Sequence, residues 1–172
     1  GRVTDSAAKA LEWYRRGETA GCNEASYRMA ETILLSPSSA ARRDEALRFL
    51  RHNENGDGRK TYLLGVCSLN GIGVDTDYLA ARKLFESAVD QGSTDAFAEL
   101  GLMHEQGWGG MIDQTAAGRI FRDGAEAGNA FCMERYAKRL AQGRGVPRDP
   151  KLSQIWLGRA ANTTANQLHT AV

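Results

Sequence analysis

The chain of 172 residues is 42% hydrophobic and 25% charged, with only 3 prolines and a formal net charge of +1. These proportions fit a folded, mostly helical protein and exclude an intrinsically disordered chain. Because basic and acidic residues are interleaved, the chain has no long-range field that would recruit nucleic acid or an anionic membrane. No apolar run approaches the roughly 18 to 20 residues that span a bilayer, so we expect no membrane insertion by this segment.

Glycines recur at a fixed interval along the chain. Gly71, Gly107 and Gly143 stand 36 residues apart, in the segments "NGIGVDTD", "QGWGGMID" and "QGRGVPRD". A phosphate-binding loop would occur once, and both the third glycine of G-x-G-x-x-G and any G-K-[ST] are missing from the sequence. Self-similarity at a fixed period instead indicates a repeat array, in which each unit buries its apolar face against its neighbours.

Each unit is predicted to be two short helices, A and B, joined by a tight turn. In residues 94–128, helix A ends at Gly107, helix B begins near Asp113, and Gly128 ends the unit. The apolar residues recur at helical spacing, with Ala96, Leu100 and Met103 in helix A and Ala117, Ile120, Phe121 and Ala125 in helix B.

In chain order, this pattern predicts one all-α domain over residues 1–172. The domain opens at residues 5–20 with helix B of a first repeat whose helix A is absent, which indicates a fragment of a longer chain. Four repeats with a period of 35 or 36 residues follow at 23–56, 59–92, 94–128 and 129–163. Residues 164–172 form either a frayed tail or part of a capping element. The expected fold class is therefore an α/α solenoid, a superhelix of about four helix-turn-helix repeats.

Small and bulky residues occupy fixed columns of the repeat. In helix B, a small residue is followed three and four positions later by a bulky apolar pair, as Ala81 is by Leu84 and Phe85. In helix A, Gly65 and Gly101 each cost about 0.5 to 1 kcal/mol relative to alanine. Close crossing of the helices is expected to offset that cost. The small residues of the helix B column are Ala10, Ala46, Ala81, Ala117 and Ser153.

The turns carry helix caps and apolar plugs. The residues expected to cap helix B at its N-terminus are Ser6, Asp77, Asp113 and Asp149. A carboxylate at these positions takes the place that a bound phosphate would need. Val74 and Val146 are expected to plug their turns. Gly110 stands where a third valine is expected, so Met111 or Ile112 is expected to supply that plug.

These columns resemble the Sel-one-like repeat family, a relative of the tetratricopeptide repeats. The shared pattern runs A-x-x-x-L-G, G-x-G-V-x-x-D and A-x-x-[WF]-[YFL]-x-x-A, with a closing glycine, and "YLLGVCSLNGIGVDTDYLAARKLFESAVDQG" at 62–92 carries it nearly whole. The resemblance covers residues 3–163, although "LSPSSAARRD" replaces the glycine turn of the unit at 23–56. It implies a scaffold that holds a partner protein in signalling, envelope biogenesis, secretion or protein quality control.

The resemblance also implies a binding groove, since helix A lines the concave side of the tetratricopeptide fold. A groove that is part aromatic and part charged suits an extended peptide or a partner helix. Alternatively, its aromatic residues complete the core between helices. Trp108, between glycines in its turn, is either an exposed contact or folds back onto helix B. The residues expected on the concave side are Tyr27, Glu31, Arg59, Tyr62, Val66, Leu102, Phe131 and Lys138, beside Glu24, Leu69, Asp95, Glu105 and Glu134.

The sequence offers no constellation for catalysis, a metal or a cofactor. The cysteines are 22, 67 and 132, the histidines are 52, 104 and 169, and no spacing among them fits a zinc site. There is also no nucleophile elbow and no H-E-x-x-H motif. We therefore expect no catalytic residues, no bound metal and no cofactor.

Two classes of function follow. The first is a non-catalytic scaffold or adaptor for a protein or peptide partner. A variant of this function, in a short bacterial member, is an inhibitor that caps one enzyme or toxin. The alternative is the hydrolase or penicillin-binding activity suggested for cysteine-rich relatives, which carry paired cysteines in each unit, unlike this chain. Arginine heavily outnumbers lysine, which favours a bacterial source. The compartment stays open between periplasm and cytoplasm.

Overall fold

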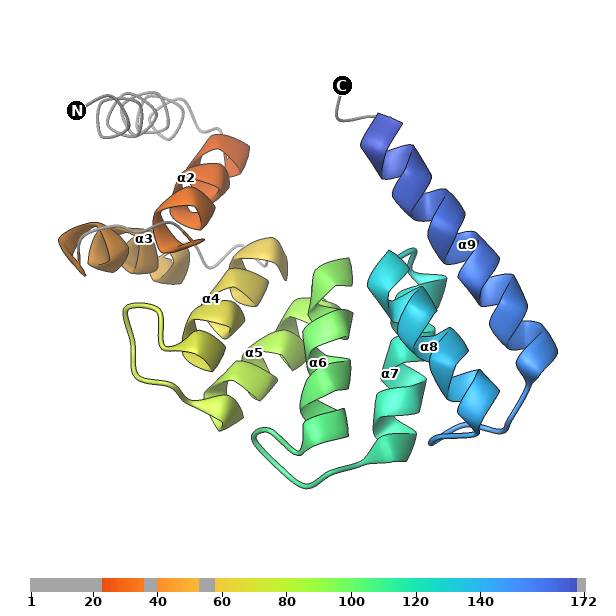
Figure 1. Cartoon of the computed structure of the whole chain (residues 1–172). Helices are drawn as coiled ribbons and strands as arrows, with labels where there is room; N and C mark the ends of the chain where they lie inside the picture. The colour runs from red at the N-terminus through yellow and green to blue at the C-terminus, as the bar shows by residue number, and fades with distance from the viewer. Residues whose placement is uncertain (1–22, 36–39, 53–57, 170–172) are drawn as a thin grey trace.

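The computed structural model describes residues 23–35, 40–52 and 58–169, and within these ranges the chain is helical and contains no strand. The helices pack in sequence order into the arc seen in Figure 1. This arrangement confirms the predicted all-α solenoid. The described helices are α2 (Asn23–Leu35), α3 (Ala40–His52), α4 (Gly58–Asn70), α5 (Tyr78–Asp90), α6 (Thr94–Gln106), α7 (Gln114–Glu126), α8 (Ala130–Gln142) and α9 (Pro150–His169).

Successive helices form antiparallel pairs that correspond to the predicted helices A and B. The pairs are α2 with α3, α4 with α5, α6 with α7, and α8 with α9, and helix B of one pair also packs on helix A of the next. The long turns that follow α4, α6 and α8 lie along one edge of the arc, the lower edge in Figure 1. The short connections that precede α6 and α8 lie at the opposite edge.

The predicted columns of small and bulky residues form the core. Ala81 and Phe85 in α5 are fully buried, as are Ala117 and Phe121 in α7. A Cβ atom at Gly101 would lie only 2.5 Å from Cε1 of Phe121, so the glycine lets the phenylalanine ring lie against the backbone of α6. The same relation joins Gly65 and Phe85 in the preceding pair. The close crossing predicted from the sequence is therefore confirmed at both glycines.

The three described carboxylate caps are in place. Asp77 accepts a hydrogen bond from the Ala80 amide at 2.9 Å, and Asp113 accepts one from the Ala116 amide at 2.8 Å. Asp149 accepts one from the Leu152 amide at 2.9 Å, which repeats the arrangement in α9. At the other end of the turn, Gly107 closes α6 in the left-handed region at φ 76°. The glycine turns therefore shape the repeat, and their carboxylates occupy the helix N-termini.

One predicted plug is wrong. Val74 and Val146 pack partly buried against the core as expected, but Met111 is 85% exposed and Ile112 is 64% exposed. The space opposite Gly110 is filled by the Arg82 guanidinium from α5, which lies where a Cβ atom of residue 110 would be. A long side chain from the preceding repeat therefore takes the place of the missing valine.

The two ends of the chain depart from the regular pattern. The unit at 23–56 forms the helix pair α2 and α3 although it lacks the glycine turn. At the other end, α9 continues without interruption to His169, so the residues that follow position 163 extend the last helix. The predicted helix at 5–20, with Ser6 and Ala10, lies outside the described residues.

Candidate interaction surface

Contacts between helices define which side of the arc is crowded. Two of the three neighbouring pairs of A helices touch each other, α2 with α4 and α6 with α8, whereas α4 and α6 do not do so to the same extent. In the described ranges, no contact of this extent joins the B helices α3 and α5, α5 and α7, or α7 and α9. Elements on the inside of a curved array lie closer together than those on the outside. We therefore call the surface formed by α2, α4, α6 and α8 the inner face.

Two tyrosines mark the N-terminal half of the inner face. Tyr27 is buried, and the Arg59 guanidinium lies 5.1 Å from the centre of its ring. Tyr62 is half-buried, and its ring centre lies 5.8 Å from that of Phe85. Burial is the main cause that raises the pKa of each tyrosine to about 12. Both phenols therefore remain protonated at neutral pH and can donate hydrogen bonds.

Carboxylates surround these tyrosines. Glu31 lies 3.7 Å from Arg28 on α2, while Asp95 and Glu99 lie on α6. Burial first, and then negative charge on Glu99, Asp95 and Glu31, raise the pKa of Tyr62. Burial also raises the pKa of Glu99 itself.

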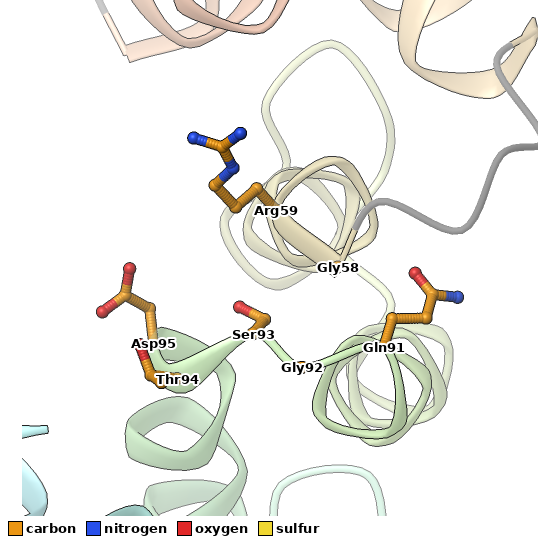
Figure 2. A pocket seen from close by; sticks show the side chains of 7 residues that line it. All are labelled: Gly58, Arg59, Gln91, Gly92, Ser93, Thr94 and Asp95. Atoms are coloured by element: carbon orange, nitrogen blue, oxygen red, sulfur yellow. The ribbon is translucent and has the colours of Figure 1, made fainter. Parts of the chain in front are cut away.

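A polar pocket of about 260 Å³ opens between the starts of α4 and α6 (Figure 2). Gly58 lines the pocket at the start of α4, and Arg59 and Asp95 extend toward the same side. Gln91 lies at the other end of the pocket. Ser93 is buried and does not cap α6 through its side chain. The pocket is large enough to accept one polar side chain of a partner.

The C-terminal half of the inner face is apolar at its centre and basic at its edge. Leu102 on α6 is half-buried and packs against the core, as does Val66 on the neighbouring α4. Phe131 is 40% exposed, and the Arg135 guanidinium lies 5.0 Å from the centre of its ring. Lys138 is exposed one turn further along α8. Phe131 is thus the most exposed of the large aromatic side chains on the described inner face.

A carboxylate shared by three arginines lies beside this surface. Glu105 is 8% exposed, and its Oε1 atom lies 3.2 Å from Nη1 of Arg144 and 3.5 Å from Nη2 of Arg139. Its Oε2 atom lies 4.0 Å from Nη1 of Arg135 and accepts no hydrogen bond. Burial is the main cause that lowers the pKa of Arg139; Glu105 acts in the opposite direction, and Arg144 and Arg135 lower the pKa further. The cluster ties α6, α8 and the following turn together.

Trp108 lies away from the inner face, in the turn between α6 and α7. Its ring stacks on that of Tyr78, with centres 5.9 Å apart and planes at 18°. It therefore folds back onto a B helix, α5, and still remains 40% exposed. Leu79, Met111 and Ile112 are exposed around it, so the tryptophan belongs to a separate apolar patch.

The two described cysteines are buried, and His104 contacts an arginine. Burial raises the pKa of Cys67 to about 11 and that of Cys132 to about 12, which keeps both thiols protonated and unreactive. His104 faces the Arg82 guanidinium at 2.9 Å. No group of three or more potential metal ligands occurs within the described ranges. None of the helices there has the length and apolarity needed to cross a bilayer.

Most of the predicted binding residues lie on one set of helices, and other residues of interest lie on the same helices. Tyr27, Glu31, Arg59, Tyr62, Val66, Leu102, Phe131 and Lys138 all lie on the A helices that form the inner face. Sequence reasoning missed Glu99 and Arg135, which hold the same column as the buried Leu63 at intervals of 36 residues. The change from a core leucine at position 63 to charged residues at the same position of the next two repeats could have identified them. Arg139 and Arg144 were missed because no repeat pattern predicts a cluster around Glu105.

Solved structures show what the fold resembles. The Sel1 repeat protein from Oxalobacter formigenes matches with a TM-score of 0.79 and 25% identity, over 91% of this chain and 64% of that one. The protective antigen c5321 of uropathogenic Escherichia coli, which displays an SLR fold, matches with a TM-score of 0.75 and 22% identity, over 91% of this chain and 33% of that one. The chain thus spans less than two thirds of the length of each.

A third solved structure is shorter. Helicobacter pylori cysteine rich protein B (hcpB) matches with a TM-score of 0.59 and 12% identity, over 79% of this chain and 98% of that one. No curated protein matches the sequence.

The family comparison finds Sel1 repeats in this sequence. The model of the Sel1 repeat matches residues 1–22, 61–93, 95–129 and 130–162, which is more than half of the chain. It leaves out the segment in which "LSPSSAARRD" replaces the glycine turn. With this match and the helix pairs described above, the chain belongs to the Sel1 repeat family.

Proposed function

We propose that this protein is a non-catalytic scaffold that binds a segment of a partner protein on its inner face. Sel1 repeat proteins generally mediate protein–protein interactions. We choose this face because Phe131 on α8 is 40% exposed there, with the Arg135 guanidinium over its ring. Exposed aromatic and arginine side chains are the residue types that contribute most to protein interfaces.

The shape of the inner face supports an elongated ligand. Its anchor points lie on three successive A helices, from Tyr62 on α4 to Phe131 on α8, with the polar pocket beside Arg59 between α4 and α6. An extended peptide or a helix of the partner can touch several of these points at once. Tyr27 is buried and contributes to the core, so we assign contact with the partner to Tyr62, Arg59 and Phe131 first.

This scaffold serves a bacterial process such as signalling, envelope biogenesis, secretion or the inhibition of one enzyme. The three solved structures described above are bacterial proteins. The hydrolase or penicillin-binding alternative has no comparable support. Cys67 and Cys132 are buried free thiols, so the described repeats lack the paired cysteines of the relatives for which that activity was suggested.

The proposal is tested by affinity capture followed by hydrogen exchange. The wild-type protein and the variants Tyr62→Ala, Phe131→Ala and Lys138→Glu are immobilised, with Arg119→Glu on α7 as the matched outer control. We expect one partner to be retained by the wild type and by Arg119→Glu, and to be lost or weakened at least tenfold by two or more inner-face variants.

Hydrogen exchange of the purified complex then locates the contact. Added protection should fall on α4, α6 and α8 rather than on α5 and α7. Protection confined to the B helices would refute the inner face as the binding site. If no partner is retained while the purified protein turns over a small substrate, the scaffold itself is refuted.

A further inference from the structure

The cluster around Glu105 carries more positive than negative charge. Three guanidinium groups, those of Arg135, Arg139 and Arg144, lie within 4.0 Å of one carboxylate. One carboxylate cannot neutralise three guanidinium groups, so the cluster has a net charge of +2. Positive charge held at this density on one part of a nearly neutral protein favours an anionic ligand there.

The guanidinium of Arg139 already donates hydrogen bonds within the protein, so Arg139 is not the binding group. It donates to the Gln114 carbonyl oxygen at 3.2 Å, to the Arg144 carbonyl oxygen at 3.1 Å and to Oε1 of Gln114 at 3.2 Å. It is also buried, with its guanidinium 5.1 Å from the centre of the Phe121 ring. Its role is to fix the turn that carries Arg144.

Arg135 has the opposite character. Its side chain is 35% exposed, and no described residue accepts a hydrogen bond from its guanidinium. The guanidinium lies 5.0 Å from the centre of the Phe131 ring, which holds it in place. An arginine held in this way presents its donors in a fixed fork, the geometry that matches a carboxylate. Arg135 is therefore a preformed donor without an acceptor.

Two more cations extend this surface. Lys138 is exposed on the next turn of α8, and no carboxylate of the described chain forms an ion pair with it. The Arg144 side chain is 49% exposed, although it pairs with Glu105. Glu134 is the one exposed carboxylate among these positions of α8. Within α8, cations therefore outnumber carboxylates by three to one, while Asp95 of α6 lies beside Asn129 at the start of the helix.

We propose that Arg135, with Lys138 and Arg144, binds an aspartate or glutamate side chain of the partner beside an apolar residue that packs on Phe131. This inference rests on the proposed function and adds the chemistry of the partner: an acidic protein segment with an apolar anchor. The acidic residue meets the guanidinium fork, and the apolar residue covers the exposed ring.

The test uses a displayed library of random 12-residue peptides. The baits are the whole protein as wild type, Arg135→Gln, Arg135→Glu and, as a control with the same change of charge on an outer helix, Arg119→Glu. We expect peptides enriched by the wild type and by Arg119→Glu to contain aspartate and glutamate at about twice the frequency of the input. Arg135→Glu should lose this bias and select lysine and arginine instead.

A direct measurement follows with the best enriched peptide, labelled with fluorescein. Its affinity should fall about tenfold with Arg135→Gln, which leaves Glu105 in place and avoids a like-charge contact. Thermal unfolding of each variant shows whether the fold is kept. A parallel titration with a labelled 12-nucleotide oligothymidylate tests a nucleic acid as the anionic ligand.

The outcomes separate the two proposals. Enriched peptides without an acidic bias, or with a bias that survives in Arg135→Glu, would overturn the inference and leave the scaffold standing. Tighter binding of the oligothymidylate than of the peptide, lost with Arg135→Gln, would overturn it in favour of a nucleic acid. No enrichment by any bait would overturn both.

Discussion

Val146 fills the space that Gly118 leaves open in α7. A Cβ atom at residue 118 would lie 2.7 Å from Cγ1 of Val146 and 2.9 Å from the carbonyl oxygen of Gly145. One repeat earlier, 36 residues back, the corresponding positions hold Arg82 and Gly110, and there the long side chain comes from the helix and the glycine from the turn. The two repeats therefore fill the same space from opposite sides.

This packing reverses the usual effect of replacing a helical glycine. Gly118→Ala should destabilise the protein by about 1 to 3 kcal/mol, because the new methyl group meets the backbone of the next turn. The matched control is Gly158→Ala in α9, where nothing lies within 4 Å of the added atom. That control should stabilise by about 0.5 to 1 kcal/mol. Urea unfolding of both variants checks the prediction, which fails if the two changes have the same sign.

The exchange between Arg82 and Gly110 predicts a coupling. Gly110→Val alone displaces the Arg82 guanidinium from His104 and should cost about 1 kcal/mol. Arg82→Gly alone leaves a gap in the turn and should also destabilise. The double variant recreates the pairing of Gly118 with Val146, so its cost should be at least 1 kcal/mol below the sum of the single costs. Additive costs in a double-mutant cycle would show that the two sites do not share this space.

The regular part of the fold could be predicted from the sequence because it repeats. Ala81 and Phe85, and the cap Asp113, obey columns that recur every 35 or 36 residues, and the structure confirms each. The side chain that plugs the turn at Gly110 was predicted wrongly. Arg82 fills this space from the helix, whereas one repeat later Val146 fills it from the turn, and the pattern of a single column does not reveal this change. The repeat period of the sequence thus predicts the backbone geometry better than it predicts which side chain fills a given gap.

The candidate site was only partly predictable for a related reason. Helical phase alone places Tyr62 and Phe131 on the same set of helices, and the structure confirms that placement. The separation of Trp108 depends on its stacking with Tyr78 in the preceding repeat. The arginine cluster depends on three side chains meeting Glu105 across α6, α8 and a turn. Contacts of this kind are set by tertiary packing, which a single repeat pattern does not encode.

The glycine and phenylalanine pair of α6 and α7 predicts a rescue. Gly101→Ala brings a methyl group into the Phe121 ring and should destabilise by about 1 to 3 kcal/mol. Phe121→Leu removes the edge of the ring that would collide, at a cost of its own. The combination should be more stable than the sum of the two single costs predicts, by about 1 kcal/mol. Thermal unfolding followed by circular dichroism measures all four proteins, and the absence of any rescue would contradict the close crossing at Gly101.

His104 predicts a loss of stability in mild acid. Burial first, and then the Arg82 guanidinium, lower the pKa of His104 below its ordinary value of 6.5, although Asp113 and Glu86 act in the opposite direction. A lowered pKa in the folded state means that the unfolded chain binds the proton more readily. The contribution of His104 is therefore present above pH 6.5 and is lost as the pH falls through the folded-state pKa.

The variant His104→Gln isolates this effect, because glutamine keeps an acceptor for Arg82 and does not titrate. Urea midpoints measured between pH 7.5 and 5 should fall more steeply for the wild type than for the variant. All other ionisable groups are common to both proteins and cancel in the difference. Parallel curves would show that the folded state tolerates protonated His104.

The buried thiols predict resistance to alkylation. Burial raises the pKa of Cys67 to about 11 and that of Cys132 to about 12, so the reactive thiolate is scarce at neutral pH as well as shielded. Iodoacetamide at pH 7.5 should leave both residues unmodified in the folded protein and modify both within minutes in 8 M urea. Peptide mass mapping reads each cysteine separately. Rapid labelling of Cys132 without urea would mean that α7 and α8 separate readily, since Cys132 lies fully buried against Gly124 of α7.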